Sequence, residues 1–254
     1  LKADTGLSRG GAAGPAWPVL CEAAAKAQSD DSIEVVGVWS HLACADGGPE
    51  HPVTVRQAAH FDEALDIAAR AGLRPQVRHL ANSAATLTAP GLHYDLVRAG
   101  VAVYGLSPLP DARPPGAFGL RPAMTLASSV ALVKRVPAGS GVSYGHLYTT
   151  TGDATLALVP LGYGDGVPRA AAGRAQVLLA GQRWTVAGAV CMDQFVIDAG
   201  DAVVSAGDEV VLFGPGDRGE PTAREWADVL GTIDYEIVTR VGARVRRHYV
   251  GEVA

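Results

Sequence analysis

The stretch that decides the fold class is HLANSAAT, residues 79–86, followed closely by DLVRAGVAVYG, residues 95–105. In the first segment, residues 77–80 predict a short strand that ends in polar side chains. Asn82 and Ser83 follow at the point where a helix would begin. A hydroxyl and the free backbone N–H groups at a helix N-terminus form a binding site for an anion.

The second segment repeats this arrangement. Residues 101–106 are apolar and β-branched, and they predict another strand. Arg98 and Gly100 come directly before it, so a cation stands beside a glycine that lets the backbone approach a ligand closely. The two segments predict α/β strand ends that hold a phosphate. Two ordinary strands with polar surface residues are the alternative on these segments alone.

Composition and charge limit the classes of function. The 254 residues are 48% hydrophobic, which is enough to build one large domain or two. The 21 basic and 26 acidic residues give a net charge of -5, which argues against a nucleic acid or an anionic membrane as partner. No apolar run approaches the roughly 20 residues of a membrane span. The cysteines Cys21, Cys44 and Cys191 form no C-x-x-C pair, so we expect a reducing cytoplasm and neither a disulfide framework nor a metal site.

Helix and strand alternate in the first region, residues 1–118. Residues 15–28 predict a helix, residues 33–41 a strand, and residues 54–71 an amphipathic helix. This alternation is typical of parallel βα units. Because a complete (β/α)8 barrel needs about 250 residues, the region predicts the later half of such a barrel.

The third of these elements carries signals for both of its ends. Thr54 and Gln57 predict a capping box at the start of the helix, and Gly72 stands where a helix C-terminus favours glycine. We therefore expect the helix to begin at Thr54.

A mainly antiparallel β domain is predicted for residues 119–254. The Pro-rich residues 107–115 predict a linker in front of it. Short strands separated by glycine turns then follow at residues 124–136, 154–161, 175–179, 184–190 and 209–213. One helix, residues 222–230, interrupts the strands.

Side chains at strand ends and turns are the candidates for chemistry. The segment KADTGLSRGG leaves a strand and turns through glycines, so it presents Arg9, whose guanidinium suits bidentate capture of a carboxylate. His41 ends a predicted strand, Tyr144 and Tyr163 stand beside glycines in turns, and Met192 lies in the sequence CMDQ. Taken singly, each also fits a structural role as a surface arginine, a packed histidine, a packed aromatic or a core residue.

Taken together, the motifs resemble alanine racemase, a pyridoxal-phosphate enzyme built from an α/β barrel and a C-terminal β domain. Eight of them occur in matching order along nearly the whole chain: LKxDTGxxRxG, SHxAxAD, HxANSAAT, DxVRxGxAxYG, VSYG, GYxDGVPR, CMDQ and TIxYExVT. Each motif is modest alone, but eight in order identify the chain as a member of that family.

The resemblance implies a role for each candidate residue. The substrate would be bound by Arg9, which takes its carboxylate, and by Lys2, Met192 and Tyr163. The cofactor, pyridoxal 5'-phosphate, would be held by Ser83, Gly100, Val101, Tyr235, Arg98, His79 and Asn82. Catalysis would depend on Tyr144, as one of two bases, with Arg98 and His41.

The implied activity is the interconversion of L-alanine and D-alanine, which supplies D-alanine for peptidoglycan. The implied assembly is a homodimer with shared active sites, because Tyr144 follows a semi-rigid linker and Arg9 and Arg98 precede it. The family's Schiff-base lysine lies in a motif like VVKAxAYGHG, which this sequence does not contain. We therefore expect that lysine on an N-terminal barrel segment outside this chain, and we expect the chain alone to be inactive.

Two other interpretations stay open. The chain could belong to a related racemase or decarboxylase of the same architecture that acts on serine, lysine or ornithine. It could also be a non-catalytic fragment that only binds a partner.

Overall fold

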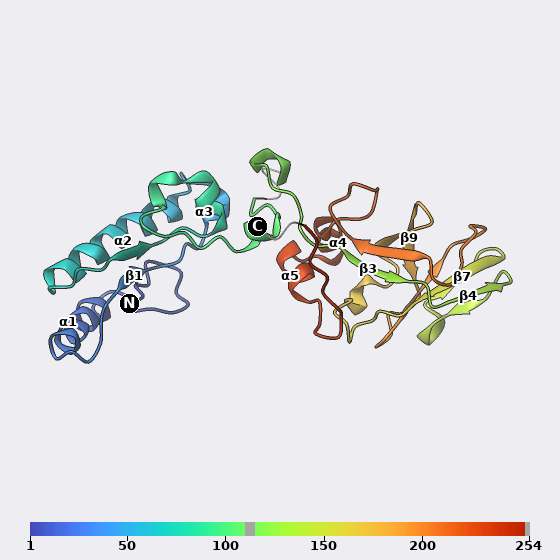
Figure 1. The fold of residues 1–254 in the computed structure, drawn as a ribbon, viewed down its shortest axis with the longest axis horizontal. Coiled ribbons are helices and arrows are strands. Elements are labelled where there is room, and N and C mark those ends of the chain that lie inside the picture. The colour runs from blue at the N-terminus through green and yellow to red at the C-terminus, as the bar shows by residue number, and fades with distance from the viewer. Residues whose placement is uncertain (110–114, 252–254) are drawn as a thin grey trace. The chain divides into compact units, whose positions relative to one another are not determined.

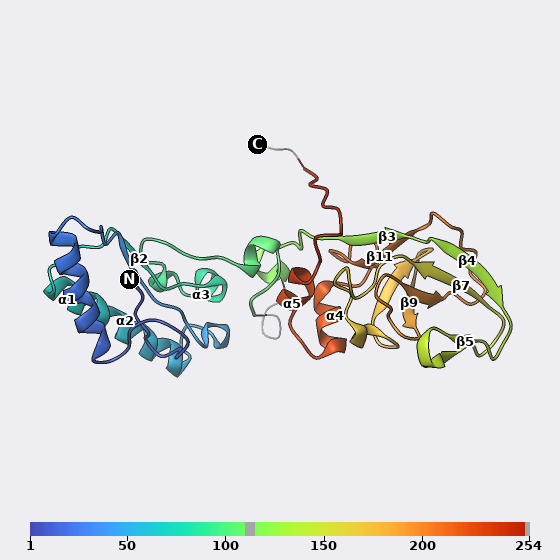
Figure 2. The same cartoon turned by 90° about the horizontal axis from the view of Figure 1, so that it is seen from below.

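The computed structural model describes residues 1–109 and 115–251 (Figure 1, Figure 2). They divide into two compact units, Leu1–Arg121 and Pro122–Ala254, which we describe separately. Within the described ranges, no helix is both long and apolar enough to cross a membrane. Most of the predicted linker, residues 110–114, lies outside the described residues, and the predicted domain boundary at residue 118 stays a prediction.

The first unit is an α/β arrangement, as predicted. Its elements are α1 (Ala16–Ser29), β1 (Gly37–Trp39), η1 (Ala45–Gly47), α2 (Pro52–Arg70), β2 (Val77–His79), α3 (Ser83–Thr88), η2 (Pro90–Leu92), η3 (Val101–Tyr104) and η4 (Pro115–Phe118).

Parallel strand segments form the centre of this unit. β1 pairs with β2 in parallel, with Trp39 opposite His79. Isolated parallel bridges extend the row on both sides, from Lys2 to Trp39 and from His79 to Leu96. Four successive segments thus run in the same direction, which is the βα pattern of a barrel.

Helices α1 and α2 pack together against these strands, and Figure 1 shows them alongside each other. The indole N–H of Trp17 on α1 donates to the carbonyl of Ala64 on α2 at 2.9 Å. Phe61 and Val38 are fully buried in the same core. Because side chains alternate along a strand, burial of Val38 beneath the helices turns its neighbour Trp39 to the opposite face of the sheet.

The strand predicted at residues 101–106 is wrong. Residues 101–104 form the 3-10 turn η3, which ends at Gly105 in the left-handed region with φ of 72°. The backbone N–H groups of Gly100 and Ala102 both point at the Ser83 hydroxyl, so they do not enter a sheet. Val103 is exposed, and its β-branched side chain therefore packs on no sheet face.

The capping box predicted for the second helix is also wrong. α2 begins two residues earlier, at Pro52, and its N-cap is His51, whose Nδ1 accepts from the Val53 N–H. The Thr54 hydroxyl instead donates to the Cys44 carbonyl at 3.0 Å. The expected C-terminal glycine is confirmed, because Gly72 has φ of 90° directly after the helix.

The second unit is mainly antiparallel, as predicted. Its larger sheet has the order β3-β11-β8-β9-β10-β7-β4, and β5 pairs with β6 separately. The strands are β3 (Leu126–Ser129), β4 (Leu132–Val136), β5 (Gly141–Val142), β6 (Tyr148–Thr149), β7 (Ala154–Val159), β8 (Gln176–Leu179), β9 (Gln182–Ala187), β10 (Phe195–Asp198) and β11 (Glu209–Phe213). The 3-10 turns are η5 (Tyr144–His146) and η6 (Arg169–Ala171).

Two α-helices lie in this unit where one was predicted. α4 (Ala223–Leu230) begins at the capping box of Thr222 and Glu225, and its Trp226 packs in the core beneath the sheet. The unpredicted α5 (Asp234–Thr239) has six residues and no side-chain cap. Figure 2 shows α4 and α5 at one end of the unit and β5 near the other end.

Candidate functional site

In the first unit, three side chains stand in register at the C-terminal ends of neighbouring strand segments. Lys2 pairs with Trp39, and Trp39 pairs with His79. Residues paired in register point to the same face of a sheet. The Lys2 ammonium accordingly lies over the Trp39 ring, 4.7 Å from its centroid, and the His79 ring is stacked beside the indole at 6.2 Å.

Arg98 joins this row from the next segment. Its Nε–H donates to His79 Nε2 at 2.5 Å, and one of its terminal N–H groups donates to His41 Nδ1 at 2.9 Å. The other ring nitrogen of His79 donates to the Leu96 carbonyl at 2.8 Å, which makes His79 neutral with its proton on Nδ1. The guanidinium carbon of Arg98 lies 4.5 Å from the Trp39 ring centroid. The structure therefore brings together four of the predicted site residues in this unit.

Both histidines are held in the neutral form. Burial lowers the pKa of His41, and the positive charges of Arg98, Arg9 and Lys2 lower it further. Burial also lowers the pKa of His79, and the positive charge of Arg98 lowers this pKa further. The hydrogen bond to the Leu96 carbonyl has the opposite effect but does not cancel the decrease. Arg98 thus meets two neutral acceptors.

Positive charge in this cluster is not cancelled by acidic side chains. Among the residues that the structure describes, no ion pair joins Lys2, Arg9 or Arg98 to a carboxylate. Cations held close together without carboxylate partners create a local positive potential that attracts an anion. This arrangement suits an anionic ligand.

Arg9 is exposed on a loop whose shape is set by Asp4. The Asp4 carboxylate accepts from the backbone N–H groups of Gly6, Leu7 and Ser8 at 3.0, 3.0 and 3.1 Å. Burial alone would raise the pKa of Asp4, but these three donors and the charge of Lys2 lower it overall. The loop closes at Gly11, where φ is 115° and a Cβ would lie 3.0 Å from the backbone of Asp4.

Lys2 also approaches this loop directly. A Cβ on Gly10 would lie 3.4 Å from the Lys2 ammonium nitrogen, which places the Lys2 side chain beside the residue that follows Arg9. This position beside the Arg9 loop is compatible with the predicted place of Lys2 in the substrate site, which stays a prediction.

Ser83 is the centre of the predicted phosphate site. It is buried at the start of α3, and its Oγ accepts from the N–H of Gly100 at 2.8 Å and of Ala102 at 3.4 Å. No described residue accepts the Ser83 hydroxyl proton, so that proton is available to a phosphate oxygen. Gly100 leaves room on its side, since a Cβ there would meet only Ser83 Oγ, at 3.8 Å. These residues fit the phosphate of the implied cofactor.

Asn82 has a structural task at this position. Its side-chain oxygen caps α3 by accepting from the Ala85 N–H at 3.1 Å. Asn82 therefore fixes the start of α3, where Ser83 lies. Val101, the other residue predicted to hold the phosphate through its backbone, follows Gly100 at the start of η3.

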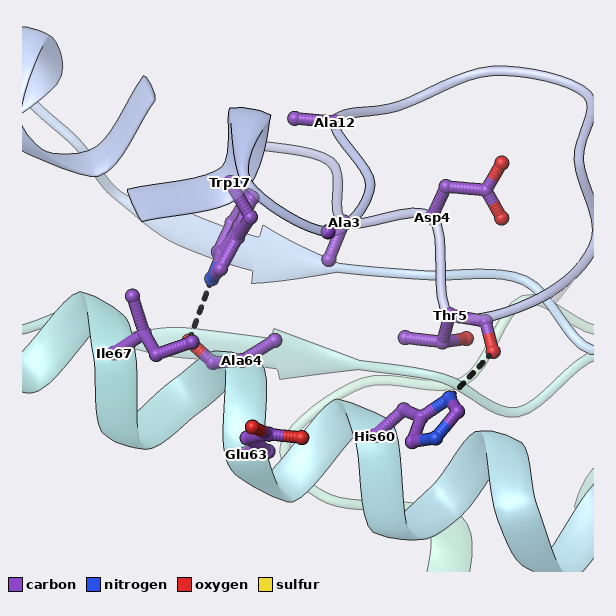
Figure 3. A pocket seen from close by; sticks show the side chains of 10 residues that line it. Ala3, Asp4, Thr5, Ala12, Trp17, His60, Glu63, Ala64 and Ile67 are labelled. Atoms are coloured by element: carbon purple, nitrogen blue, oxygen red, sulfur yellow. Dashed lines mark hydrogen bonds between the residues drawn. The ribbon is translucent and has the colours of Figure 1, made fainter. Parts of the chain in front are cut away.

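A cavity of about 330 Å³ lies behind the Arg9 loop and is separate from this cluster (Figure 3). Its His60 and Thr5 are paired within the protein. His60 Nδ1 lies 3.3 Å from the Thr5 carbonyl, and the Thr5 hydroxyl is 2.8 Å from that of Ser40. The cavity lies between the N-terminal segment and α2, with Asp4 on one wall and Glu63 on the other (Figure 3).

In the second unit, Tyr144 stands on a tightly held turn after β5. Its side chain is 76% exposed, and the flanking Ser143 and Gly145 have φ of 59° and 69°. The Ser143 hydroxyl donates to the Ala189 carbonyl at 2.8 Å and lies 3.4 Å from the Cys191 sulfur. Only glycine fits at position 188, because a Cβ there would lie 2.5 Å from the Val142 carbonyl oxygen.

Tyr163 and Met192 are joined to the same loop. The Tyr163 N–H donates to the Cys191 carbonyl at 3.0 Å, and the Gly164 N–H donates to the Met192 carbonyl at 2.8 Å. A Cβ on Gly162 would overlap both carbonyl groups. The structure therefore brings Tyr144, Tyr163 and Met192 together on loops that meet at Cys191.

Tyr235 lies on another element of this unit, although the chain just after that element contacts the Tyr163 loop, where the Gly242 N–H donates to the Asp165 carbonyl at 2.8 Å. Tyr235 is carried by α5, and Figure 2 shows α5 and β5 at opposite ends of the unit. Its neighbour Asp234 is buried, and burial raises the pKa of that carboxyl although backbone N–H groups and Arg224 act against the rise.

Trp39 was not predicted from the sequence, because a tryptophan near the end of a strand belongs to no motif that marks it as functional. Its place becomes visible only in the strand register, which puts Lys2 on one side and His79 on the other. These two residues lie 37 and 40 residues away from Trp39 in the chain.

The comparisons with known proteins give one consistent answer. A family model described as "Alanine racemase, N-terminal domain" matches residues 1–108, and one described as "Alanine racemase, C-terminal domain" matches residues 123–249. An alanine racemase of Frankia casuarinae is 65% identical over 250 residues, or 98% of this chain, and the chain spans 65% of that relative's length.

Solved structures agree with the sequence matches. The alanine racemase from D-cycloserine producing Streptomyces lavendulae superposes with a TM-score of 0.94 at 56% identity, covering 100% of this chain and 66% of that one. The alanine racemase from Bacillus anthracis, solved with bound L-Ala-P, gives a TM-score of 0.87 at 36% identity, covering 96% and 62%.

Proposed function

Because the chain belongs to the alanine racemase family, we propose that it carries the ligand-binding centre and one catalytic base of an enzyme that interconverts L-alanine and D-alanine. The enzyme would supply D-alanine for peptidoglycan and would work in the cytoplasm. The observation that carries the proposal is the cluster of Lys2, Arg9 and Arg98, which has no carboxylate partner among the described residues but would meet the carboxylate of alanine and the ring nitrogen of a cofactor.

The fit of pyridoxal phosphate rests on the pocket around Ser83. Ser83 would donate its hydroxyl proton to a phosphate oxygen, with the backbone at Gly100 and Val101 close by. Arg98, held by two neutral imidazoles, would donate a remaining N–H to the ring nitrogen. When bound, the cofactor withdraws electrons from the substrate's α-carbon, so that the α-proton becomes acidic.

The residues of this chain would then bind and move a proton. Arg9 would fix the substrate carboxylate and thereby the direction of the α-C–H bond. The phenolic oxygen of Tyr144 would accept or return the proton on one face of the α-carbon, and a second base would act on the other face. Tyr163 and Met192, which share the Cys191 loop with Tyr144, would limit the size of the substrate side chain.

We further propose that the working enzyme is a homodimer with shared sites. Support comes from within the second unit, where α5, which carries Tyr235, and β5, which precedes the Tyr144 turn, lie at opposite ends (Figure 2). Residues on elements at opposite ends of one unit are poorly placed to contact the same small ligand. A two-fold partner resolves this, because it can present its own Tyr144 to the first chain's cofactor.

The test is a chimera in which this chain is joined to the part of the Frankia casuarinae racemase that it does not match. With pyridoxal phosphate, the chimera should convert L-alanine to D-alanine, as followed by chiral chromatography. Serine, lysine and ornithine are offered in parallel. Faster conversion of one of these, or release of carbon dioxide, would replace alanine racemisation by one of the related activities. Absence of any turnover with a bound cofactor would leave a non-catalytic role.

A further inference from the structure

Trp39 is the only described aromatic residue that contacts two cations of the cluster. Lys2 lies 4.7 Å from the centroid of its ring and Arg98 lies 4.5 Å from it. These distances are well inside the limit of about 6 Å for a cation–π contact. The stacked His79 ring, 6.2 Å away at an angle of 28°, stands beside the indole and accepts the Arg98 Nε–H.

The chemistry of an indole differs from that of the partner most arginines have. A carboxylate would orient Arg98 as well, but it would cancel the positive charge and compete with an anionic ligand for the same N–H groups. The face of an aromatic ring attracts a cation through its quadrupole and leaves every N–H donor free. Around Arg98, neutral imidazoles supply the hydrogen bonds and the indole supplies the attraction.

We propose that Trp39 is a positioning residue, whose indole face holds the guanidinium of Arg98 and the ammonium of Lys2 in place without occupying the N–H groups that a ligand would use. The identity of that ligand rests on the proposed function. The placement of the two cations by Trp39 does not, and it can be measured in the chain without any ligand.

The register of the strands explains why residue 39 can serve both cations. Lys2 and His79 are its direct neighbours on the two sides, and Arg98 follows the segment that pairs with His79. A side chain at this position therefore lies between the substrate-binding loop and the phosphate-binding strand ends. Substitution at Trp39 should disturb both groups of residues at once.

The experiment is nuclear magnetic resonance on the 254-residue chain, with the variants Trp39→Phe and Trp39→Leu. The readouts are the ring-current shifts of the Lys2 and Arg98 side-chain protons and the exchange rate of the Arg98 Nε–H with water. In Trp39→Leu we expect the ring-current shifts to vanish and the exchange to accelerate roughly 2- to 30-fold, the factor that a cation–π contact supplies. Trp39→Phe keeps an aromatic face and should retain part of both effects.

Trp184→Leu is the matched control, because Trp184 is partly exposed like Trp39 but lies in the second unit, where its indole N–H donates to Leu179. This control should leave the Lys2 and Arg98 signals unchanged. The inference is overturned if both Trp39 variants fold, as judged by circular dichroism, and neither changes the Arg98 exchange rate more than the control. Should Trp39→Leu fail to fold, the result for Trp39→Phe decides in the same way.

This outcome is independent of the racemase assay. A chimera that is inactive on every amino acid would remove the proposed function and leave the placement of Arg98 by Trp39 intact. An active chimera together with unchanged signals in the Trp39 variants would support the proposed function and overturn the placement of Arg98 by Trp39.

Discussion

The backbone N–H of Gly100 donates a hydrogen bond of 2.8 Å to the side-chain oxygen of Ser83, and this bond joins two segments that lie 17 residues apart. It ties the start of α3 to the turn η3, and it leaves the Ser83 hydroxyl proton without an acceptor among the described residues. The phosphate site is thus built from two segments at once.

We expect Ser83→Ala to weaken the binding of pyridoxal phosphate roughly 10- to 150-fold, because one hydrogen bond to a charged group contributes about 1.5–3 kcal/mol. Absorbance titration of the chimera with the cofactor measures the dissociation constant. The control is Ser29→Ala, which removes a hydroxyl that donates only to the Lys26 carbonyl at the end of α1. Equal affinity in the two variants would show that Ser83 holds no phosphate.

Arg9→Ala should raise the KM for alanine roughly 10- to 150-fold while the affinity for the cofactor stays within about twofold, again from the contribution of a charged hydrogen bond. Arg9→Lys keeps the charge but not the bidentate geometry, so it should recover only part of the loss. Arg56→Ala, at an exposed position of α2, is the control. An unchanged KM in Arg9→Ala would remove the carboxylate role.

Local signals predicted those parts of the fold that local chemistry determines. The helix predicted at residues 222–230 forms as α4, which begins at the capping box of Thr222 and Glu225, and residues 209–213 form β11 over the predicted range. The α5 helix was missed because it is short and begins without a side-chain cap. Residues 101–106 were assigned to a strand because β-branched residues favour strands, but the N–H groups of Gly100 and Ala102 donate to the Ser83 hydroxyl instead.

The candidate site, like the fold, could be predicted only where a local motif marks the residues. Motif spacing placed His41, Ser83 and Arg98 at strand ends. In the structure Arg98 donates to His41, and the N–H of Gly100, two residues after Arg98, donates to Ser83. The residue between them, Trp39, could not be found without the register of three segments. Long-range pairing determines that register, and a single sequence carries little information about it.

Gly162→Ala should lower the free energy of unfolding by about 1–3 kcal/mol, the usual cost of added volume in a packed region. The new Cβ would overlap the carbonyl groups of Cys191 and Met192, so the loops that carry Tyr163 and Met192 must separate. Urea denaturation measures the loss. Gly152→Ala is the matched control, because a Cβ there meets nothing within 4 Å. Equal stability of the two variants would contradict the close packing at Cys191.

His41 and His79 should make the protein less stable in mild acid. Their pKa values are lowered in the folded state, so below the unfolded value of about 6.5 the unfolded chain binds protons that the folded chain does not. The free energy of unfolding therefore rises with pH across this window, and the histidine contribution is fully present above it.

Urea denaturation between pH 5 and 8 should show this dependence, and His79→Gln should reduce the slope. His248→Gln, at an exposed position near the C-terminus, should leave the slope unchanged. A slope that is identical in His79→Gln and the parent protein would mean that His79 titrates alike in both states.

The shared-site homodimer makes a complementation test possible with two inactive chimeras. Tyr144→Phe lacks the catalytic phenol but has an intact cofactor site, and Arg98→Leu has the reverse defect. In a mixed dimer with shared sites, one of the two sites combines the intact Arg98 of one chain with the intact Tyr144 of the other. Random mixing makes half of the dimers mixed, so about one quarter of the parent activity should return.

The control mixture combines the double variant Tyr144→Phe/Arg98→Leu with Tyr144→Phe, and it should stay inactive because no site can gain the phenol. Native mass spectrometry of differently tagged chains establishes that mixed dimers have formed. Recovery near one quarter requires Tyr144 to act on the partner's ligand, since chains that use their own Tyr144 would have a defect in every site. Persistent inactivity of verified mixed dimers would assign Tyr144 to its own chain and rule out the exchange between partners.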